Sequence, residues 1–390
     1  MSAIDNKYAQ LGGPSGFLGK PTSPETALLT VPFGSYRHYE HGSIYWNSLS
    51  GAYEVHGLIQ AKWAALGWEK SFLGYPKSDE SDSGNGAKGR YNMFQFGAIT
   101  WKSGAKEAFE QHGEIRSKYC QLGCEAGVLG FATTDETLTP DLKGRYNHFE
   151  NGSIYWKSTI SAHEVHGPIH QYWSNNGWEK NPDLGYPISD VLPAHPGSNS
   201  FFSDFENGVV YVKEGLTNAT SLLKFTIADA SETAAQVIAE INKAIVKALT
   251  SNPRVYITSG PTFTGVSDYH WDGATVHNRL YQVHVEIGLD ISGVPDPSSV
   301  FDFGIEIHFD RTKGTIWAAL HNWHVDTFVP WPTSWGVTAD TINNDYHKVL
   351  DPLIGAPQNS KTVPAGFHLL SAKVMLNGDL NIYMQPLLDK

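Results

Sequence analysis

The sequence predicts a mainly β protein of the α+β class: four tandem repeats, each a helix plus a β-hairpin, followed by an α+β domain with an antiparallel meander covered by helices. Three observations predict this fold. A glycine-aromatic motif recurs four times at nearly constant spacing. Charged residues make up only 17% of the chain, whereas glycine reaches 38 residues, which is typical of turn-rich β structure. Near residue 215 the repeats give way to long alternating segments, so we expect two domains, residues 1–215 and 216–390.

The four repeat units comprise residues 4–57, 58–113, 114–167 and 168–215. Each begins with a short helix, as Ile59, Trp63 and Leu66 show at spacings i, i+4 and i+7, and the helix ends at a glycine. A Leu-Gly turn, a hairpin and, in the first three units, a histidine-glycine step follow. One unit is too small to bury its own apolar face. We therefore expect neighbouring units to complete the core in a compact array that is closed or nearly closed.

The hairpin register follows from the turn. In the third unit, Asn151-Gly152 suits a two-residue type I′ turn, because both residues tolerate positive φ. Counting outward from this turn pairs His148 with Tyr155 and places Trp156 on the opposite side of the sheet. We expect the tryptophan side to face the core and the His148 side to face solvent. The same register would bury the tryptophans of the first two hairpins, Trp46 and Trp101.

The predicted solvent side of hairpins one and three has the chemistry of a sugar-binding surface, with an imidazole next to a phenol. The candidate ligand-binding residues there are Tyr36, His38, Tyr45, Tyr146, His148 and Tyr155. Unit two has Met93 and Thr100 instead, so we expect two equivalent sites, in units one and three. The histidines of the histidine-glycine steps form a second set of candidates, either as ligand-binding or as structural groups: His56, His112 and His166.

The helix, the Leu-Gly-x-Pro turn, the Gly-Arg-Tyr strand and the histidine-glycine step recur in this order. In these motifs residues 4–214 resemble the LGFP-repeat family, which occurs as arrays in actinobacterial envelope proteins and elsewhere. The resemblance implies attachment to carbohydrate or to a cell wall. The chain departs from the pattern at Ala132 in place of proline, Met93 in place of histidine and Val212 in place of tryptophan. Units two and four are therefore the weaker candidates for binding.

The second domain follows a polar linker at residues 217–221. We expect a strand over 222–228, a helix ending at Leu249, a second helix over 339–350 and a final hairpin that turns at Asn377-Gly378. Alternation predicts long strands over 281–291, 301–309 and 315–327. Such strands under an amphipathic helix distantly resemble the tubular lipid-binding (TULIP) domains, although no short motif supports the likeness.

Candidate metal and catalytic groups lack the expected spacing. His321, His324 and Asp326, with three further groups upstream, would supply enough metal ligands, but they fit neither a metal-binding helix nor a zinc ribbon. The upstream groups are His270, Asp272 and His277. Gly-x-Ser-x-Gly is absent, and the acidic segment 79–86 lacks EF-hand spacing. We expect no metal, no cofactor and no catalytic residue, and we expect Cys120 and Cys124 to be small buried residues.

Composition also limits the partners. The net charge is −12 and no stretch is basic, which argues against nucleic acid or an anionic membrane. Residues 1–5 lack the apolar segment of a signal peptide, and no apolar run is long enough for a transmembrane segment. We expect a soluble protein that is cytoplasmic at synthesis. A signal removed from the sequence, non-classical export and assembly into a homo-oligomer stay open.

These observations favour a non-enzymatic, lectin-like protein that recognises cell-wall or surface glycans through several weak repeat sites, strengthened by multivalency. Two alternatives stay open. One is a hydrolytic enzyme with the repeats as its targeting module, which would require the histidines and aspartate at 270, 272, 321 and 324 to converge. The other is binding of lipid or another hydrophobic ligand by the C-terminal domain, which would require an apolar tunnel under the helix at 231–249.

Overall fold

The computed structural model forms two compact units, Met1–Asn175 and Asn176–Lys390. It describes residues 1–29, 33–84, 88–194, 198–222, 224–228, 232, 235, 239, 254–268, 279–290, 295–330, 338–354, 358–375, 377 and 379–386. Of the helix expected to end at Leu249, only residues 232, 235 and 239 are described. The upstream candidates His270, Asp272 and His277 lie outside the described residues.

Unit 1 contains three similar repeats, each with a helix and a four-stranded antiparallel sheet in meander order. The first has α1 (Ala3–Gln10), β1 (Thr26–Leu28), β2 (Gly34–Tyr39), β3 (Gly42–Asn47) and β4 (Gly51–His56). The second has α2 (Gly57–Leu66), β5 (Ser81–Asp82), β6 (Gly89–Met93), β7 (Gly97–Lys102) and β8 (Phe109–His112). The third has α3 (Gly113–Gln121), β9 (Thr137–Leu138), β10 (Gly144–His148), β11 (Gly152–Lys157) and β12 (Ser161–His166), and α4 (Gly167–Asn175) follows. The predicted helix-plus-hairpin repeat is confirmed, with one further strand on each side of the hairpin.

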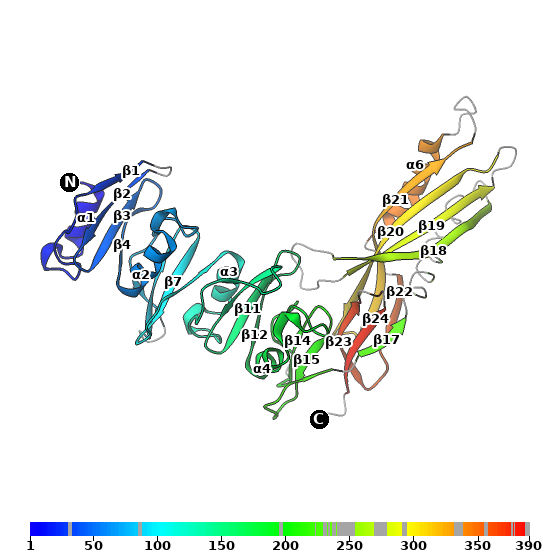
Figure 1. Cartoon of the computed structure of the whole chain (residues 1–390). Coiled ribbons are helices and arrows are strands. Elements are labelled where there is room, and N and C mark those ends of the chain that lie inside the picture. The colour runs from blue at the N-terminus through cyan, green and yellow to red at the C-terminus, as the bar shows by residue number, and fades with distance from the viewer. Residues whose placement is uncertain are drawn as a thin grey trace. The chain divides into compact units, whose positions relative to one another are not determined.

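Helices and sheets alternate along unit 1, as Figure 1 shows. Helix α2 contacts β3 and β4 of the first sheet and β7 and β8 of the second, and α3 makes the same contacts one repeat later. Helix α4 contacts β11 and β12. Each sheet is therefore covered on one face by its own helix and on the other by the helix of the next repeat. The expected closure of the array stays a prediction.

The predicted hairpin turn is wrong by one residue, which shifts the cross-strand pairing by two. Tyr146, not His148, pairs with Tyr155, and the hairpin closes over Glu150 and Asn151. Gly152 belongs to the strand rather than to the turn. A Cβ atom on Gly152 would lie 2.4 Å from the carbonyl oxygen of Val165, so close packing with the neighbouring strand requires this glycine.

The predicted exposure of the hairpin aromatics is also wrong. Tyr45 and Tyr155 are each only 3% exposed. The Tyr45 ring meets Trp63 of α2 edge-on at a centroid distance of 4.6 Å, and Tyr155 meets Trp173 of α4 at the same distance. The tryptophans expected in the core, Trp46, Trp101 and Trp156, are half-buried. Since helices cover both faces of the sheet, neither face is the solvent side.

The Leu-Gly turn joins consecutive repeats. The ring of Tyr75, in the second repeat, lies over Gly34 in the first, where a Cβ atom would come within 2.8 Å of it. Phe131 covers Gly89 in the same way, at 2.4 Å. In these two turns the aromatic residue therefore needs a glycine at the start of the preceding hairpin, which explains why the two motifs occur together there.

The described residues of unit 2 form three antiparallel sheets. The fourth-repeat sheet follows η4 (Trp178–Lys180) and has β13 (Leu192–Pro193), β14 (Phe201–Asp204), β15 (Val209–Val212) and β16 (Thr220–Ser221). A three-stranded sheet has the order β17 (Lys224–Ala228), β24 (Leu380–Pro386) and β23 (Phe367–Val374). A five-stranded sheet has β18 (Arg254–Asp268), β19 (Arg279–Asp290), β20 (Ser298–Asp310), β21 (Thr315–Phe328) and β22 (Gln358–Thr362).

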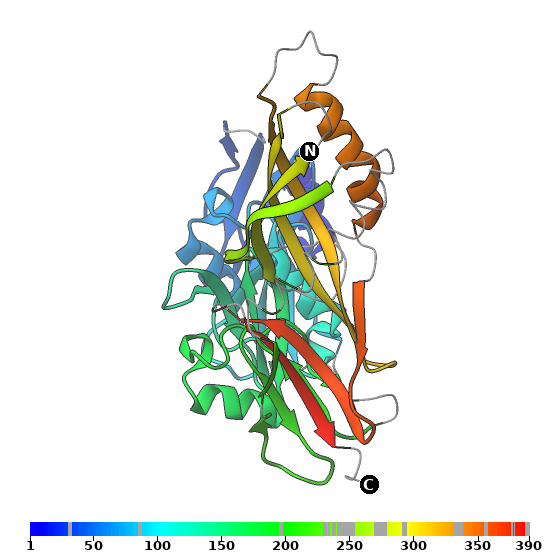
Figure 2. The same cartoon turned by 90° about the vertical axis from the view of Figure 1, so that its right-hand side faces the viewer.

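The five-stranded sheet confirms the predicted antiparallel meander. Helix α6 (Ala339–Leu350) packs on β21 and is followed by η6 (Asp351–Leu353); Figure 2 shows it in orange beside the long strands. The shared core includes Tyr281, Phe301 and Tyr346, and the inward residues of β23 and β24 complete it. Among the described residues, no helix is both long and apolar enough to cross a membrane.

The fourth-repeat sheet packs against β23 and β24. Phe202 and Tyr211 share one core with Leu370 and Tyr383, and the Gln385 side-chain amide donates to the Tyr211 hydroxyl at 2.6 Å. Tyr211 holds the same place in its hairpin as Tyr45 in the first. The C-terminal sheet thus covers the face that the next helix covers in earlier repeats. This interface joins residues on both sides of the domain boundary expected between residues 215 and 216. The boundary itself stays a prediction.

Candidate ligand-binding surfaces at the repeat joints

The histidine-glycine step forms the joint between consecutive repeats. In the first joint, β4 ends at His56, whose Nδ1 lies 2.8 Å from Oε2 of Glu54. Its Nε2 lies 3.3 Å from Oε1 of Glu80, which belongs to the second repeat. The Glu80 amide donates to Glu54 at 2.9 Å, and Arg90 Nε donates to Glu80 at 2.5 Å. The joint is therefore a network of two acids and two bases.

Burial sets the electrostatics of this network. The two carboxylates, Glu54 and Glu80, are almost inaccessible, and burial raises the pKa of Glu80. Burial alone lowers the pKa of His56, but the hydrogen bond and charge of Glu54, with the charge of Glu80, outweigh this effect and raise it. The histidine is thus held in a fixed orientation with a preference for its charged form.

The second joint repeats this network. Nδ1 of His112 lies 2.9 Å from Glu110 and 3.2 Å from Glu136, and Arg145 Nε donates to Glu136 at 2.5 Å. The third histidine, His166, has its Nδ1 2.7 Å from Glu164. All three predicted joint histidines thus have carboxylate partners at i−2. The recurring motif pointed to these histidines but not to the carboxylates that reach them from the next repeat.

An exposed aromatic ring covers each of the first two joint histidines. The Phe17 ring centroid lies 4.9 Å from that of His56, and Phe72 lies 4.6 Å from His112. Both phenylalanines are about half exposed, at 48% and 49%. We define the first joint surface as Phe17, Glu54, His56, Glu80 and Arg90. The second joint surface consists of Phe72, Glu110, His112, Glu136 and Arg145.

The predicted hairpin candidates are brought together, and two of them, Tyr45 and Tyr155, are buried. Tyr36 stacks on Tyr45 at 5.2 Å and lies 4.9 Å from His38. Tyr146, His148 and Tyr155 form the same cluster in the third repeat. Tyr45 and Tyr155 belong to the core between repeats, whereas Tyr36, His38, Tyr146 and His148 are partly exposed at its edge. Their role in ligand binding stays a prediction, and the exposed joint surfaces were missed because Phe17 and Phe72 stand outside the hairpin motif.

A buried chain of polar groups connects hairpin three to α4. The Ser153 hydroxyl lies 2.6 Å from His148 Nδ1 and 2.8 Å from His170 Nε2. Ser153 is fully buried, so this pairing does not form an accessible nucleophile. Burial, with the nearby charges of His148 and His166, lowers the pKa of His170 to about 4. In the first joint the equivalent partner of the serine is Gln60, which donates to Ser43 at 2.6 Å.

His170 should make unit 1 sensitive to acid. Its folded-state pKa lies below the ordinary value of 6.5, so as pH falls from 6.5 to about 4 the unfolded chain takes up the proton first and stability is lost. The loss should approach about 3 kcal/mol below pH 4, because one pKa unit corresponds to about 1.4 kcal/mol. The variant His170→Gln, which places the side chain of Gln60 at the equivalent position, should show a shallower loss in urea unfolding at pH 7 and pH 4.5. Identical pH slopes for both proteins would contradict this prediction.

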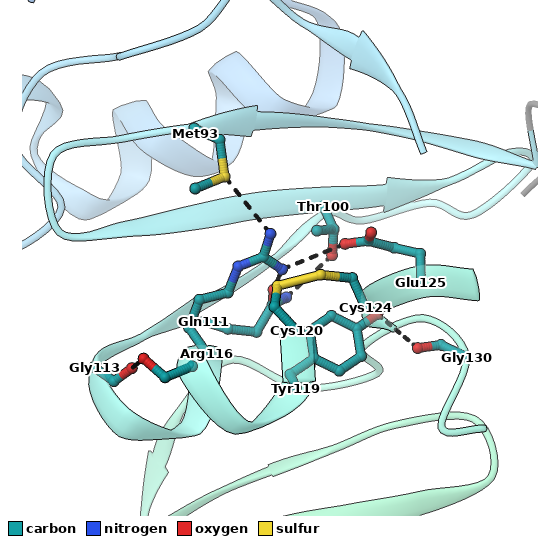
Figure 3. The surroundings of a disulfide bond; sticks show 11 residues. Met93, Thr100, Gln111, Gly113, Arg116, Tyr119, Cys120, Cys124, Glu125 and Gly130 are labelled. Atoms are coloured by element: carbon teal, nitrogen blue, oxygen red, sulfur yellow. Dashed lines mark hydrogen bonds and ion pairs between the residues drawn. A yellow bond between two sulfur atoms is a disulfide. The ribbon is translucent and has the colours of Figure 1, made fainter. Parts of the chain in front are cut away.

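The two cysteines form a disulfide, so the expectation of small buried residues is wrong. Cys120 in the last turn of α3 is bonded to Cys124, the first residue of η3 (Cys124–Ala126). Beside the disulfide, Arg116 pairs with Glu125 at 3.4 Å and donates to the Met93 sulfur at 3.6 Å (Figure 3). Met93 holds the place of the hairpin histidine, so in the second repeat Arg116 of the next helix contacts this position instead of a histidine, while the joint network around His112 is kept.

The candidate metal ligands of the C-terminal domain contact different acidic residues. His321 Nδ1 lies 3.6 Å from Glu306, whose other histidine neighbour is His308 at 3.2 Å. His324 pairs with the exposed Asp326 at 3.5 Å. In the part of the chain that the structure describes, no cluster of three or more histidine, cysteine or acidic side chains could hold a metal ion.

The geometry defines a tandem-repeat protein with a joint network between successive units. The family model of the LGFP repeat matches three consecutive stretches, residues 18–71, 73–127 and 129–181, each beginning at the leucine of a Leu-Gly turn. These three stretches are LGFP repeats, and the resemblance drawn from the sequence is confirmed over residues 18–181. LGFP repeats are often associated with surface or cell-wall proteins. No curated protein matches the chain.

Proposed function

We propose that this protein is a non-enzymatic glycan-binding protein that attaches to a cell wall or another glycan-bearing surface through its repeat joints. The observation that carries the proposal is the exposed phenylalanine over an immobilised histidine, found at His56 and again at His112. An exposed ring can stack on the apolar face of a sugar, and a rigid imidazole can bond a hydroxyl. Because buried glutamates fix each histidine, little side-chain freedom is lost on binding.

A repeated surface suits a repeated ligand. The two joint surfaces follow each other after one repeat, so one polysaccharide chain can engage more than one repeat, and weak single contacts then add up to firm attachment. The acidic balance of the chain, with a net charge of −12, supports a glycan over nucleic acid. The six hairpin candidates are a weaker alternative, since Tyr45 and Tyr155 would have to leave the core to reach a ligand.

The double variant Phe17→Ala and Phe72→Ala tests this proposal. We expect retention on the best-bound polysaccharide to fall at least about tenfold, because each replacement removes a stacking partner. The melting temperature should stay nearly unchanged, since both rings are half exposed. The control is Phe33→Ala, which removes an exposed phenylalanine that belongs to neither joint surface. Wild-type retention by the folded double variant would contradict the proposal.

A further inference from the structure

The two joint surfaces differ at their arginines. In the first, all sides of the Arg90 guanidinium are occupied. Its Nε donates to Glu80, its Nη1 pairs with Asp82 at 2.7 Å, and its Nη2 donates to the Glu80 carbonyl at 3.1 Å. The side chain is about one-third exposed, but it has no open edge with which to meet a ligand.

In the second joint surface the matching position is apolar. Arg145 keeps the Nε bond to Glu136 and a long Nη2 bond of 3.5 Å to the Glu136 carbonyl. Its direct cross-strand neighbour is Leu138, just as Asp82 is the neighbour of Arg90. Within the described residues, no acceptor pairs with Nη1 of Arg145. One edge of a partly exposed guanidinium is therefore open.

The histidines of the two joint surfaces also differ in how their ring nitrogens contact the carboxylates. His56 uses both ring nitrogens, Nδ1 toward Glu54 and Nε2 toward Glu80. His112 makes its closest contacts to Glu110 and Glu136 through Nδ1, and in the described part of the joint its Nε2 makes no hydrogen bond to a carboxylate. Phe72 and Leu138, 49% and 46% exposed, supply apolar surface beside these two donors.

We infer that the second joint surface is the stronger saccharide site, that Asp82 weakens the first by occupying Arg90 and leaving it mainly the Phe17 ring for contact, and that the ligand is an uncharged sugar. This inference rests on the proposed function and names its site and ligand class. The open edge of Arg145 and Nε2 of His112 donate to hydroxyl or amide oxygens of the sugar, while Phe72 and Leu138 contact its apolar face. Glu110 and Glu136 offset the charge of the arginine whether His112 is neutral or protonated, so the surface has no excess positive charge to select a carboxylate.

Exchanging the residues at positions 82 and 138 tests the inference. The aspartate of Leu138→Asp should pair with Arg145 as Asp82 pairs with Arg90, and so weaken the site. Asp82→Leu should free Arg90 and strengthen the first. By isothermal titration calorimetry with cellohexaose, chitohexaose and hexagalacturonate, we expect the wild-type protein to bind a neutral hexasaccharide tightly at one site. Leu138→Asp should weaken this binding at least tenfold, and Asp82→Leu should raise the number of tight sites to two.

The control is Leu142→Asp, which makes the same change of charge at an exposed leucine nearby; it should bind like the wild type. Unchanged affinity in Leu138→Asp, a single tight site in Asp82→Leu, or tighter binding of hexagalacturonate would overturn the inference. These outcomes leave the proposed function standing, because glycan retention would still depend on Phe17 and Phe72. Failure of every oligosaccharide, with retention unaffected by the phenylalanine changes, would overturn both.

Discussion

Replacing Trp63 by alanine is expected to lower the free energy of unfolding by about 3–5 kcal/mol, the range for emptying a large aromatic site in a core. Trp63 is fully buried in α2. Its ring meets Tyr45 of the first sheet at 4.6 Å and Phe94 of the second repeat at 5.2 Å. One side chain thus fills the space between two repeats, and its loss leaves a cavity that neither sheet can close alone.

The matched control is Trp63→Phe. The indole Nε1 is buried without a hydrogen-bond partner among the described residues, so phenylalanine removes volume but no polar contact. We expect it to cost clearly less than alanine. Urea unfolding of the full chain, with hydrogen exchange followed in residues 34–66, measures both effects. Equal stability of the alanine variant and the wild type would show that Trp63 does not fix the joint.

The repeat architecture could be predicted because its signals are local. Helix spacing, the glycine after each helix and the Leu-Gly turn all lie within a few residues of each other. The hairpin register could not be predicted in this way. Gly152 follows an asparagine and so suggests a turn, but the strand needs this glycine because Leu129 and the Val165 carbonyl approach it closely. A contact from outside the hairpin overrides the local turn preference.

The exposure of the hairpin faces was mispredicted for a related reason. Trp63 fits the helical pattern of its own repeat, and nothing in that pattern shows that it also covers Tyr45 in the preceding one. Part of each joint site, its histidine, could be predicted from the sequence. Recurrence pointed to His56 and His112, whereas Glu80 and Glu136 reach them from the following repeat, each held by an arginine. Contacts between residues that are distant in sequence decide which of the predicted groups are accessible.

In the fourth repeat, the residue at the position of the hairpin histidines His38 and His148 has a different role. There it is Asp204, at the end of β14, and its side chain is only 5% exposed. It pairs with Lys373 of β23, which is equally buried, and Arg311 Nη2 lies 3.8 Å away. Lys373 also donates to the Phe205 carbonyl. Burial lowers the pKa of Arg311, although the charge of Asp204 opposes this effect. One carboxylate thus serves two cations at the junction with the C-terminal sheet.

Asp204→Asn is therefore expected to destabilise unit 2 by about 3–5 kcal/mol, because removing one partner leaves a buried charge uncompensated. The loss comes from Lys373, which cannot reach water without separating β23 from the fourth-repeat sheet. Adding Lys373→Met to the same variant removes that charge and should restore most of the stability, since a buried ion pair can often be replaced by apolar groups at little cost. Urea unfolding of wild type, single and double variants measures the difference. If the double variant is no more stable than Asp204→Asn alone, the ion pair is not what holds the fourth repeat to the C-terminal sheet, and the apolar contacts of Phe202 and Tyr211 must do so instead.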